Sequence, residues 1–273
     1  MKDLSVFCLN CFGSPISFNR SLRFKLIAKE IEKINPDLVM LQEVISPSYM
    51  KILHNELDKF GWKFYSSRSG LLVSGGLVII SKKLELMNLE FYKFKEQGPI
   101  TFLSLTDRIL GKGFQMAECK INGSNVLLIN THLLCLYSKR KRDYAAQEKQ
   151  IDQLSNFITT RNIDNIILSG DLNNDPDSTM ILNFRNKHNL VDTLDTKEIT
   201  VDNNNLNRKG LLKLLGDNKP YRTDYVFVTK DMNIEKSGVI FKTSQKVNGK
   251  NIHLSDHYGV LVKLNVNRNK LNP

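Results

Sequence analysis

The chain has 273 residues, of which 41% are hydrophobic and 25% charged, as is usual for a globular protein. No apolar run reaches the roughly 18 to 20 residues of a membrane-spanning helix, so we expect no transmembrane segment. The formal net charge of +11 favours polyanionic partners, namely nucleic acid, an anionic membrane surface or phosphorylated small molecules, although abundant surface lysine explains it equally well.

The first third of the chain alternates buried strands with amphipathic helices. Met1-Lys2-Asp3 runs straight into an apolar strand, without the apolar core or cleavage site of a secretory signal, so we expect no leader. The expected elements are the strand Leu4–Leu9, the helix Ser21–Ile34 ended by Pro36, the strand Leu38–Leu41, the helix Tyr49–Leu57 begun by Ser46-Pro47, and the strand Leu77–Ile80 after Gly75-Gly76.

The rest of the chain adds hairpins to this alternation. Asn122-Gly123 is the strongest hairpin signal, because both residues tolerate a tight left-handed turn. Hairpins mixed with strand–helix pairs predict two packed sheets, each covered by helices, in a single domain over residues 1–273. The expected elements are the strands Phe114–Ile121 and Val126–Ile129, the helix Asp143–Thr160, the strand Ile163–Leu168, the helix Thr179–His188, and the strands Tyr225–Val228, Gly238–Phe241 and Gly259–Leu264.

The four cysteines, Cys8, Cys11, Cys119 and Cys135, do not have the spacing of a zinc site. A two-cysteine redox motif at Cys8 and Cys11 is the weaker alternative, because residue 8 of a strand should point into the core. We therefore expect free thiols in a reducing compartment, which indicates a cytoplasmic protein.

Polar side chains stand at the ends of six of the expected strands. Because such ends meet at one edge of a sheet, we expect them to converge on a single polar site for a hard cation and a phosphate. The residues are Asn10, Glu43, His132, Asp171 with Asn173, Asp224, and Asp256 with His257.

Glu43 follows a buried strand, where an ionised carboxylate needs a partner. Mg²⁺ is a natural one, because it keeps several waters and takes only one or two carboxylates. A salt-bridged surface glutamate is the alternative, but Asn10 and Asp256 at other strand ends favour the cation. Mn²⁺ is equally possible, because its preference for oxygen ligands overlaps with that of Mg²⁺.

Gly170-Asp171-Leu172-Asn173 is the second element of the expected site. The glycine permits a tight turn, and the spacing lets Asp171 and Asn173 face the same side. Asp171 can accept a proton from an attacking water, while Asn173 donates to a phosphoryl oxygen without adding negative charge. A helix-capping turn is the alternative, because both residue types favour caps.

Ser255-Asp256-His257 is the third element, and adjacent side chains on an extended strand diverge. Asp256 is therefore expected to face the metal and His257 the phosphate, with Asp224 holding His257 in one tautomer. The alternative is a strand-end histidine that only packs.

In this order the motifs resemble the endonuclease/exonuclease/phosphatase superfamily of metal-dependent phosphoesterases. The resemblance implies a four-layer α/β sandwich with the site at one end of its two sheets. The matching segments are Leu9-Asn10, Pro36-Asp37-Leu38, Leu41-Gln42-Glu43, Thr131-His132-Leu133, Ser169-Gly170-Asp171-Leu172-Asn173, Asp224-Tyr225 and Ser255-Asp256-His257.

The resemblance also implies a role for each site residue. It gives Asn10 and Glu43 to Mg²⁺, supported by Asp256, and the activation of water to Asp171. Asn173 and His132 are implied to stabilise the pentacovalent phosphate, and His257, paired with Asp224, to contact or protonate it.

Within the superfamily, three stretches look like neutral sphingomyelinases: Leu9–Gly13, Arg68–Leu77 and Gly111–Phe114. This similarity implies a phosphodiesterase acting on a phospholipid such as sphingomyelin, with Lys112 and Arg68 contacting the substrate. Two departures are Gln147, where those enzymes often carry arginine, and Thr223, where a branched apolar residue is commoner.

The substrate class remains open between lipid, nucleic acid and small phosphoesters. Two leucine-rich segments, Ile100–Leu110 and Asn207–Lys219, suit contact with an anionic membrane surface, although both could equally be core. A DNA or RNA endonuclease is the alternative, in which Tyr137 or Tyr221 could stack on bases, and a phosphatase of small molecules is another. A non-catalytic scaffold is disfavoured because every expected catalytic position is filled.

Overall fold

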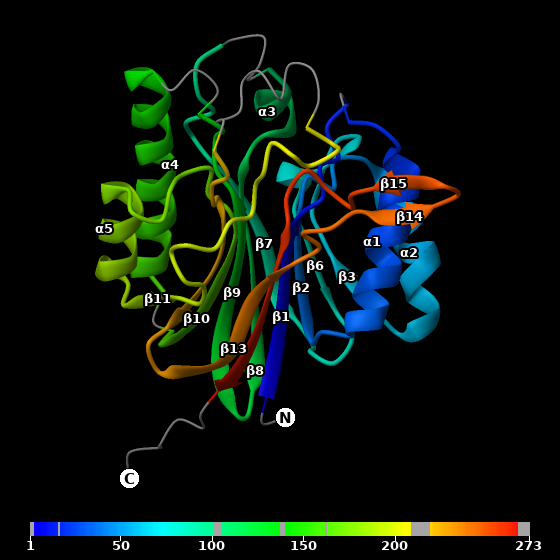
Figure 1. The fold of residues 1–273 in the computed structure, drawn as a ribbon. Coiled ribbons are helices and arrows are strands. Elements are labelled where there is room, and N and C mark those ends of the chain that lie inside the picture. The colour runs from blue at the N-terminus through cyan, green and yellow to red at the C-terminus, as the bar shows by residue number, and fades with distance from the viewer. Residues whose placement is uncertain are drawn as a thin grey trace.

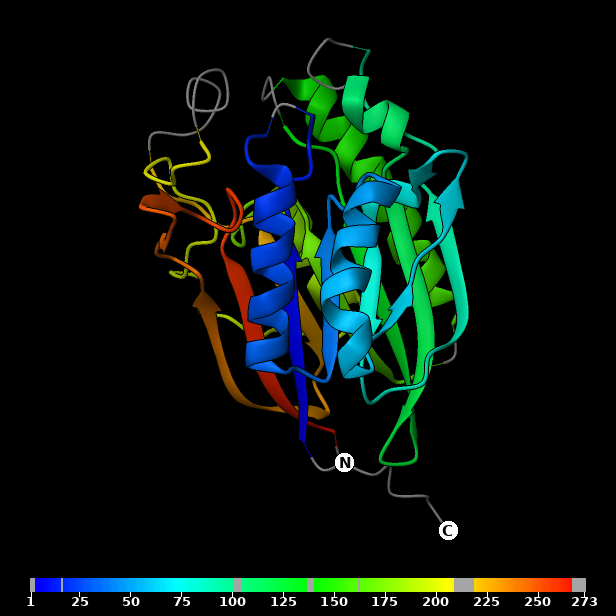
Figure 2. The ribbon, with the colours of Figure 1, turned by 90° about the vertical axis from the view of Figure 1, so that its right-hand side faces the viewer.

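The structure is a computed structural model that describes residues 3–15, 17–100, 105–136, 140–161, 163–208 and 219–266. Two six-stranded mixed sheets pack face to face, and helices cover both outer surfaces (Figures 1 and 2). This arrangement confirms the predicted four-layer α/β sandwich. Tyr137 and the leucines at 211, 212, 214 and 215, which the sequence offered for base stacking or membrane contact, lie outside the described residues.

The first sheet joins strands from both ends of the chain. Its α-helical cover is α1 (Arg20–Ile34) and α2 (Pro47–Leu57), which is followed by the short helix η1 (Asp58–Phe60). The strand order is β13 (Met232–Ile240), β16 (Gly259–Val266), β1 (Asp3–Asn10), β2 (Leu38–Gln42), β6 (Val78–Ser81) and β3 (Lys63–Tyr65).

The second sheet uses the middle of the chain and is covered by α4 (Lys141–Thr159) and α5 (Thr179–Lys187). Its order is β11 (Leu190–Asp192), β12 (Asp224–Thr229), β10 (Asn165–Asp171), β9 (Ser124–His132), β8 (Gly113–Ile121) and β7 (Met87–Lys93). The small elements are the hairpins β4 (Arg68–Ser69) with β5 (Leu72–Val73) and β14 (Gln245–Val247) with β15 (Lys250–Ile252), and the helices η2 (Ser74–Gly76) and α3 (Leu105–Leu110).

Three apolar cores hold the four layers together. The core between the sheets contains Val6, Met40 and Leu128, all fully buried. A second core lies under α1 and α2, and a third under α4 and α5. Burial of this kind contributes about 25 cal/mol per Å² of apolar surface removed from water, so each sheet is stabilised through both of its faces.

Strand register brings the predicted site residues to one edge of the sandwich. The parallel pair β1 and β2 sets Asn10 opposite Gln42, beside Glu43. In the other sheet, Asp171 lies opposite His132 on β9 and opposite Asp224 on β12. One edge therefore carries the strand-end residues of both sheets.

Most predicted elements are present, and some bounds differ. The Asn122-Gly123 hairpin is confirmed, with positive φ at both residues. The late strand predicted from Gly238 begins six residues earlier, at Met232, and pairs with β16 along its length. The four cysteines are free, and none of the described helices is both long and apolar enough to cross a membrane.

Candidate active site

The candidate site lies at the end of the sandwich that is uppermost in Figures 1 and 2, away from both chain termini. β1 ends there at Asn10, and β9 and β10 end there at His132 and Asp171. A buried amide pair crosses between the sheets just beneath, where Gln42 Nε2 donates to Asn130 Oδ1 over 2.7 Å. The two halves of the site are therefore held in a fixed relation.

Asn10 joins the two carboxylates expected to do the chemistry. Its Nδ2 donates to Glu43 Oε1 over 3.1 Å and to Asp171 Oδ2 over 3.0 Å. Its Oδ1 accepts from the Phe12 backbone N–H over 3.0 Å, which fixes the orientation of the amide. The backbone of Asn10 is held in turn, because its carbonyl accepts from the Ser255 hydroxyl over 2.5 Å.

Glu43 has the features of a cation ligand. Its backbone adopts a left-handed φ of 58°, which turns the chain directly after β2. Its Oε2 is buried without a hydrogen-bond partner among the described residues. Burial, and then repulsion from Asp256, raises the pKa of Glu43 to about 7. A buried acceptor beside a second carboxylate fits a divalent cation, which would satisfy the oxygen and offset the repulsion.

Asp171 is nearly fully buried and its carboxylate is fixed at both oxygens. Oδ1 accepts from the backbone N–H of Asn173 over 3.0 Å, and Oδ2 accepts from Asn10. Two histidines flank Oδ2, with His132 Nε2 at 3.5 Å and His257 Nε2 at 3.9 Å. The predicted convergence of these strand ends is therefore seen in the structure.

His132 is held through Lys112, which sequence reasoning had placed on the substrate. The Lys112 ammonium donates to the Leu133 carbonyl over 2.8 Å and to His132 Nε2 over 3.0 Å, and it pairs with Asp107 at 3.4 Å. Burial, and then the Lys112 charge, lowers the pKa of His132 to about 3. His132 is thus neutral, with its Nε2 as an acceptor.

His257, unlike His132, is positively charged. Its Nδ1 donates to Asp224 Oδ2 over 2.8 Å, as the sequence predicted. Burial alone would lower the pKa of His257, but the carboxylates of Asp224, Asp256 and Asp171 outweigh it and raise the pKa to about 10. The ring is therefore a cation at neutral pH, close to Asp171.

Oxygens of Asp171 and Asp224 and a ring nitrogen of His257 lie within 4.8 Å of one another, a spacing that would also suit a metal. This group is the poorer candidate, because Asp224 Oδ2 is already engaged and the ring is protonated. A cation there would be repelled by the imidazolium. Glu43 and Asn10 match a cation better.

Asp256 faces a cationic side chain that the sequence did not indicate. Arg208 Nη1 lies 3.5 Å from Asp256 Oδ2, and both side chains are buried. The segment before Arg208 is tied to the same loop, because Asn205 donates to the Ser255 carbonyl and Asn207 to the His253 carbonyl. From the sequence, Arg208 was considered only as part of the leucine-rich segment Asn207–Lys219, and no spacing linked it to Asp256.

Asn173 is placed by backbone and helix contacts. Its φ of 49° is left-handed, and its Nδ2 donates to the Leu133 carbonyl over 3.0 Å. The buried amide of Gln147 on α4 donates to the Asn173 carbonyl over 3.2 Å. The structure therefore brings together Asn10, Glu43, Lys112, His132, Asp171, Asn173, Asp224, Asp256 and His257 at one end of the sandwich.

Arg68 stands apart from this cluster, with an exposed side chain on β4. Its hairpin is nevertheless attached near the site, because the Val73 N–H donates to the Ile45 carbonyl over 3.1 Å. Asp107, the buried partner of Lys112, was also missed by sequence reasoning. A lysine between Gly111 and Gly113 just before a buried strand was the available signal that a buried countercharge was needed.

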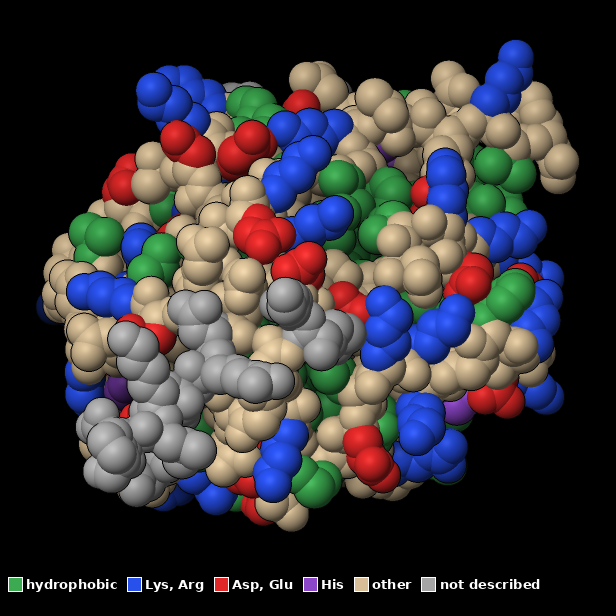
Figure 3. All heavy atoms as spheres, turned by 90° about the horizontal axis from the view of Figure 1, so that it is seen from below, with side chains coloured by type: hydrophobic (Ala, Val, Ile, Leu, Met, Phe, Trp, Pro, Cys, Tyr) green, Lys and Arg blue, Asp and Glu red, His purple; other side chains and the backbone are tan. Residues whose placement is uncertain are grey.

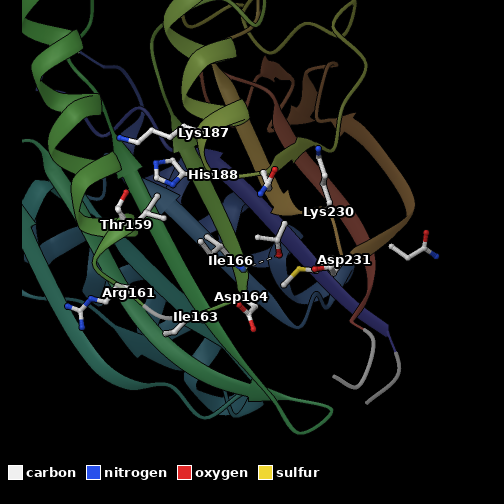
Figure 4. A pocket seen from close by; sticks show the side chains of 14 residues that line it. Thr159, Arg161, Ile163, Asp164, Ile166, Lys187, His188, Lys230 and Asp231 are labelled. Atoms are coloured by element: carbon white, nitrogen blue, oxygen red, sulfur yellow. Dashed lines mark hydrogen bonds between the residues drawn. The ribbon is translucent and has the colours of Figure 1, made fainter. Parts of the chain in front are cut away.

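A separate hollow lies at the opposite end of β10, where β12 ends at Thr229 (Figure 4). Its lining includes four charged residues, Arg161, Asp164, Lys187 and Lys230. All of them except Arg161, which is half-buried, are exposed. None of the residues predicted for the site lines this hollow. The chemistry therefore belongs to the other end of the sheets.

Comparison with known proteins agrees with this geometry. The profile of the Endonuclease/Exonuclease/phosphatase family matches residues 8–257. A putative neutral sphingomyelinase of Drosophila melanogaster is 26% identical over 97% of this chain, which spans 61% of that protein. A 5'-tyrosyl-DNA phosphodiesterase of Caenorhabditis briggsae is 27% identical over 63% of the chain and 44% of its own length. The crystal structure of beta toxin from Staphylococcus aureus superposes with a TM-score of 0.74 at 22% identity, covering 95% of this chain and 99% of that one.

Proposed function

The chain belongs to the endonuclease/exonuclease/phosphatase family, and we propose that it is a phosphoric ester hydrolase that cleaves a phosphodiester in a phospholipid such as sphingomyelin. Water is the proposed nucleophile and Mg²⁺ the proposed cofactor, with Mn²⁺ as the second candidate. The observation that carries the proposal is a pair of hydrogen bonds from the Asn10 amide to Glu43 and Asp171. They join the carboxylate best suited to hold a cation to the carboxylate best placed to act as the base.

Glu43 and Asn10 would hold the cation, and Asp256 would support them. The buried Glu43 Oε2, which has no hydrogen-bond partner in the described ranges, supports this assignment. Bound there, a divalent cation would polarise the phosphoryl oxygen and neutralise developing charge.

Asp171 would orient the attacking water and take its proton, since its carboxylate is fixed by Asn10 and by the Asn173 backbone. Asn173 and His132 would stabilise the pentacovalent phosphate. The cationic His257, held by Asp224, would contact the phosphate and donate a proton to the leaving oxygen.

Lys112 would mainly fix the tautomer and orientation of the His132 ring. Its ammonium donates to the ring Nε2, so it selects the tautomer that carries the proton on Nδ1. Direct contact of Lys112 or Arg68 with the substrate phosphate stays a prediction.

The lipid substrate is supported by sequence similarity to the sphingomyelinase-like relative, which aligns over 97% of the chain; the tyrosyl-DNA phosphodiesterase aligns over 63%. A nuclease remains the second candidate, supported by the latter relative and by the net charge of +11.

The test is hydrolysis of sphingomyelin vesicles beside supercoiled plasmid, with Mg²⁺ or EDTA, by wild type and Asp171→Asn. We expect Mg²⁺-dependent release of phosphocholine and a loss of about a thousandfold in the variant, because an amide cannot accept the proton. Asp177→Asn is the matched control, since Asp177 is an exposed carboxylate in the turn that follows. Plasmid nicking without phosphocholine release would assign the site to nucleic acid, and inactivity on both would point to small phosphoesters.

A further inference from the structure

The most exposed apolar side chains are gathered around the candidate site. Among the described residues, the four large hydrophobic side chains with the highest exposure are Leu71 at 89%, Ile100 at 81%, Ile109 at 64% and Phe18 at 60%. The next, Met87, is 45% exposed. We call these four residues the apolar rim.

Each member of the apolar rim is attached to the site end by a separate segment. Phe18 lies in the loop that follows Asn10, and its carbonyl accepts from Arg23 Nε over 2.9 Å. Leu71 is in the turn of the β4–β5 hairpin, which is bonded to Ile45, two residues after Glu43. The backbones are thus held while the apolar side chains face solvent.

The other two members, Ile100 and Ile109, lie in the segment that precedes Lys112. Ile109 is on α3, which ends two residues before Lys112, and Lys112 contacts His132. Ile100 lies two residues after Gly98. The Gly98 carbonyl accepts a hydrogen bond from Arg108 of α3, and the Gly98 Cα packs against the Leu134 side chain. Figure 1 shows α3 at the upper end of the molecule, where the strands carrying the site end.

Cationic side chains accompany the apolar ones. Arg68 is exposed on the same hairpin as Leu71, and Arg140, Lys141 and Arg142 are exposed where α4 begins, at the site end. The opposite end of the molecule, seen in Figure 3, shows Lys and Arg side chains interspersed with acidic and hydrophobic ones. The site end thus carries both protruding apolar side chains and exposed cationic ones.

We propose that the apolar rim inserts into the interface of an anionic phospholipid bilayer and so brings the site to its substrate; this inference rests on the proposed lipid phosphodiesterase function. Apolar groups on separate loops around an opening suit a fluid interface, into which each can insert independently, and the adjacent cations suit anionic headgroups. A single folded partner would instead be expected to meet one contiguous apolar patch.

The experiment is flotation of the full chain with vesicles of phosphatidylcholine and phosphatidylserine, in an Asp171→Asn background so that no lipid is cleaved. Serine replaces Phe18, Leu71, Ile100 and Ile109 together in the test protein. Phe60, Met87 and Leu182, which are exposed apolar residues outside the rim, are replaced by serine in the matched control. We expect vesicle affinity to fall by at least about tenfold in the rim variant and to stay unchanged in the control.

Two outcomes would overturn the inference. One is equal flotation of the rim variant and wild type, and the other is no flotation of wild type. If wild type does not float but the rim variant loses affinity for single-stranded DNA, the rim serves nucleic acid instead. Hydrolysis of a soluble chromogenic phosphodiester, measured for wild type and for the rim variant with Asp171 intact, separates the two proposals. We expect both proteins to hydrolyse it. Absent hydrolysis in wild type would count against the proposed function but not against membrane docking.

Discussion

A single buried amide, that of Gln147, connects the two loops that follow His132 and Asp171. Its Nε2 lies within hydrogen-bond distance of the Leu134, Leu172 and Asn173 carbonyls, and its Oε1 accepts from Asn174 Nδ2 over 2.7 Å. Gln147→Met keeps the volume but removes every one of these bonds. We expect kcat to fall about tenfold with a smaller change in KM, because the reacting groups lose their alignment rather than their contact with substrate.

Steady-state kinetics with urea unfolding checks this prediction. Gln153→Met is the control, since Gln153 lies on the same helix but bonds to the Lys93 carbonyl and the Lys95 N–H rather than to the loops that follow His132 and Asp171. An unchanged kcat in Gln147→Met would show that the loops hold their geometry without it. Equal losses in both variants would indicate a general effect on α4.

At the scale of elements, α1 is tied to the sheet by one buried guanidinium. Arg23 donates to the carbonyls of Cys11, Phe12, Phe18 and Leu254, which belong to the loop after β1 and the segment before Asp256. Arg23→Met would leave these acceptors without their donor, so we expect the free energy of unfolding to fall by about 3 kcal/mol. Urea denaturation measures it.

Lys25→Met provides the comparison, because Lys25 is exposed on the same helix and its loss should cost less than about 0.5 kcal/mol. A similarly small loss for Arg23→Met would mean that water satisfies the four carbonyls equally well.

Elements with strong apolar patterns could be predicted from sequence, and elements without them could not. β1, β2 and β10 are largely apolar runs, so the residues at or just after their ends, Asn10, Glu43 and Asp171, were identified with them. β7 was overlooked although Met87, Leu89 and Phe91 alternate with polar residues.

The rest of the site could not be reached by pattern. Asp107 and Arg208 become site neighbours only through tertiary contacts with Lys112 and Asp256, which no spacing encodes. The Lys112 contact also shows a limit of motif reasoning. A lysine beside a phosphate site suggested substrate contact, whereas its hydrogen bonds in the structure go to Leu133 and His132.

At the scale of the whole molecule, Glu43 links stability to pH and metal. Burial, and then Asp256, raises its pKa to about 7 from an ordinary 4.5, so between these values the metal-free folded protein binds a proton that the unfolded chain does not. Stability without metal should therefore fall as the pH rises through this window. Bound Mg²⁺ takes the place of the proton, so we expect it to raise Tm more at about pH 8 than at about pH 5.5.

Differential scanning calorimetry with and without Mg²⁺ at the two pH values tests this coupling. In Glu43→Gln the residue no longer titrates, and the Tm shift should be small at both. A wild-type shift that is as large at the lower pH as at the higher would place the cation away from Glu43.

The position of β16 has a consequence for how the protein is made. Among the described strands, β1 is synthesised before all others, yet one of its two neighbours in the sheet is β16, which is synthesised last. Until then β1 exposes an unpaired apolar edge, the kind of surface that chaperones bind and that promotes aggregation. β16, which closes this edge, begins two residues after His257. A nascent chain would therefore be inactive for as long as this edge is exposed to aggregation. It would gain Asp256 and His257 at about the same time as the strand that pairs with β1.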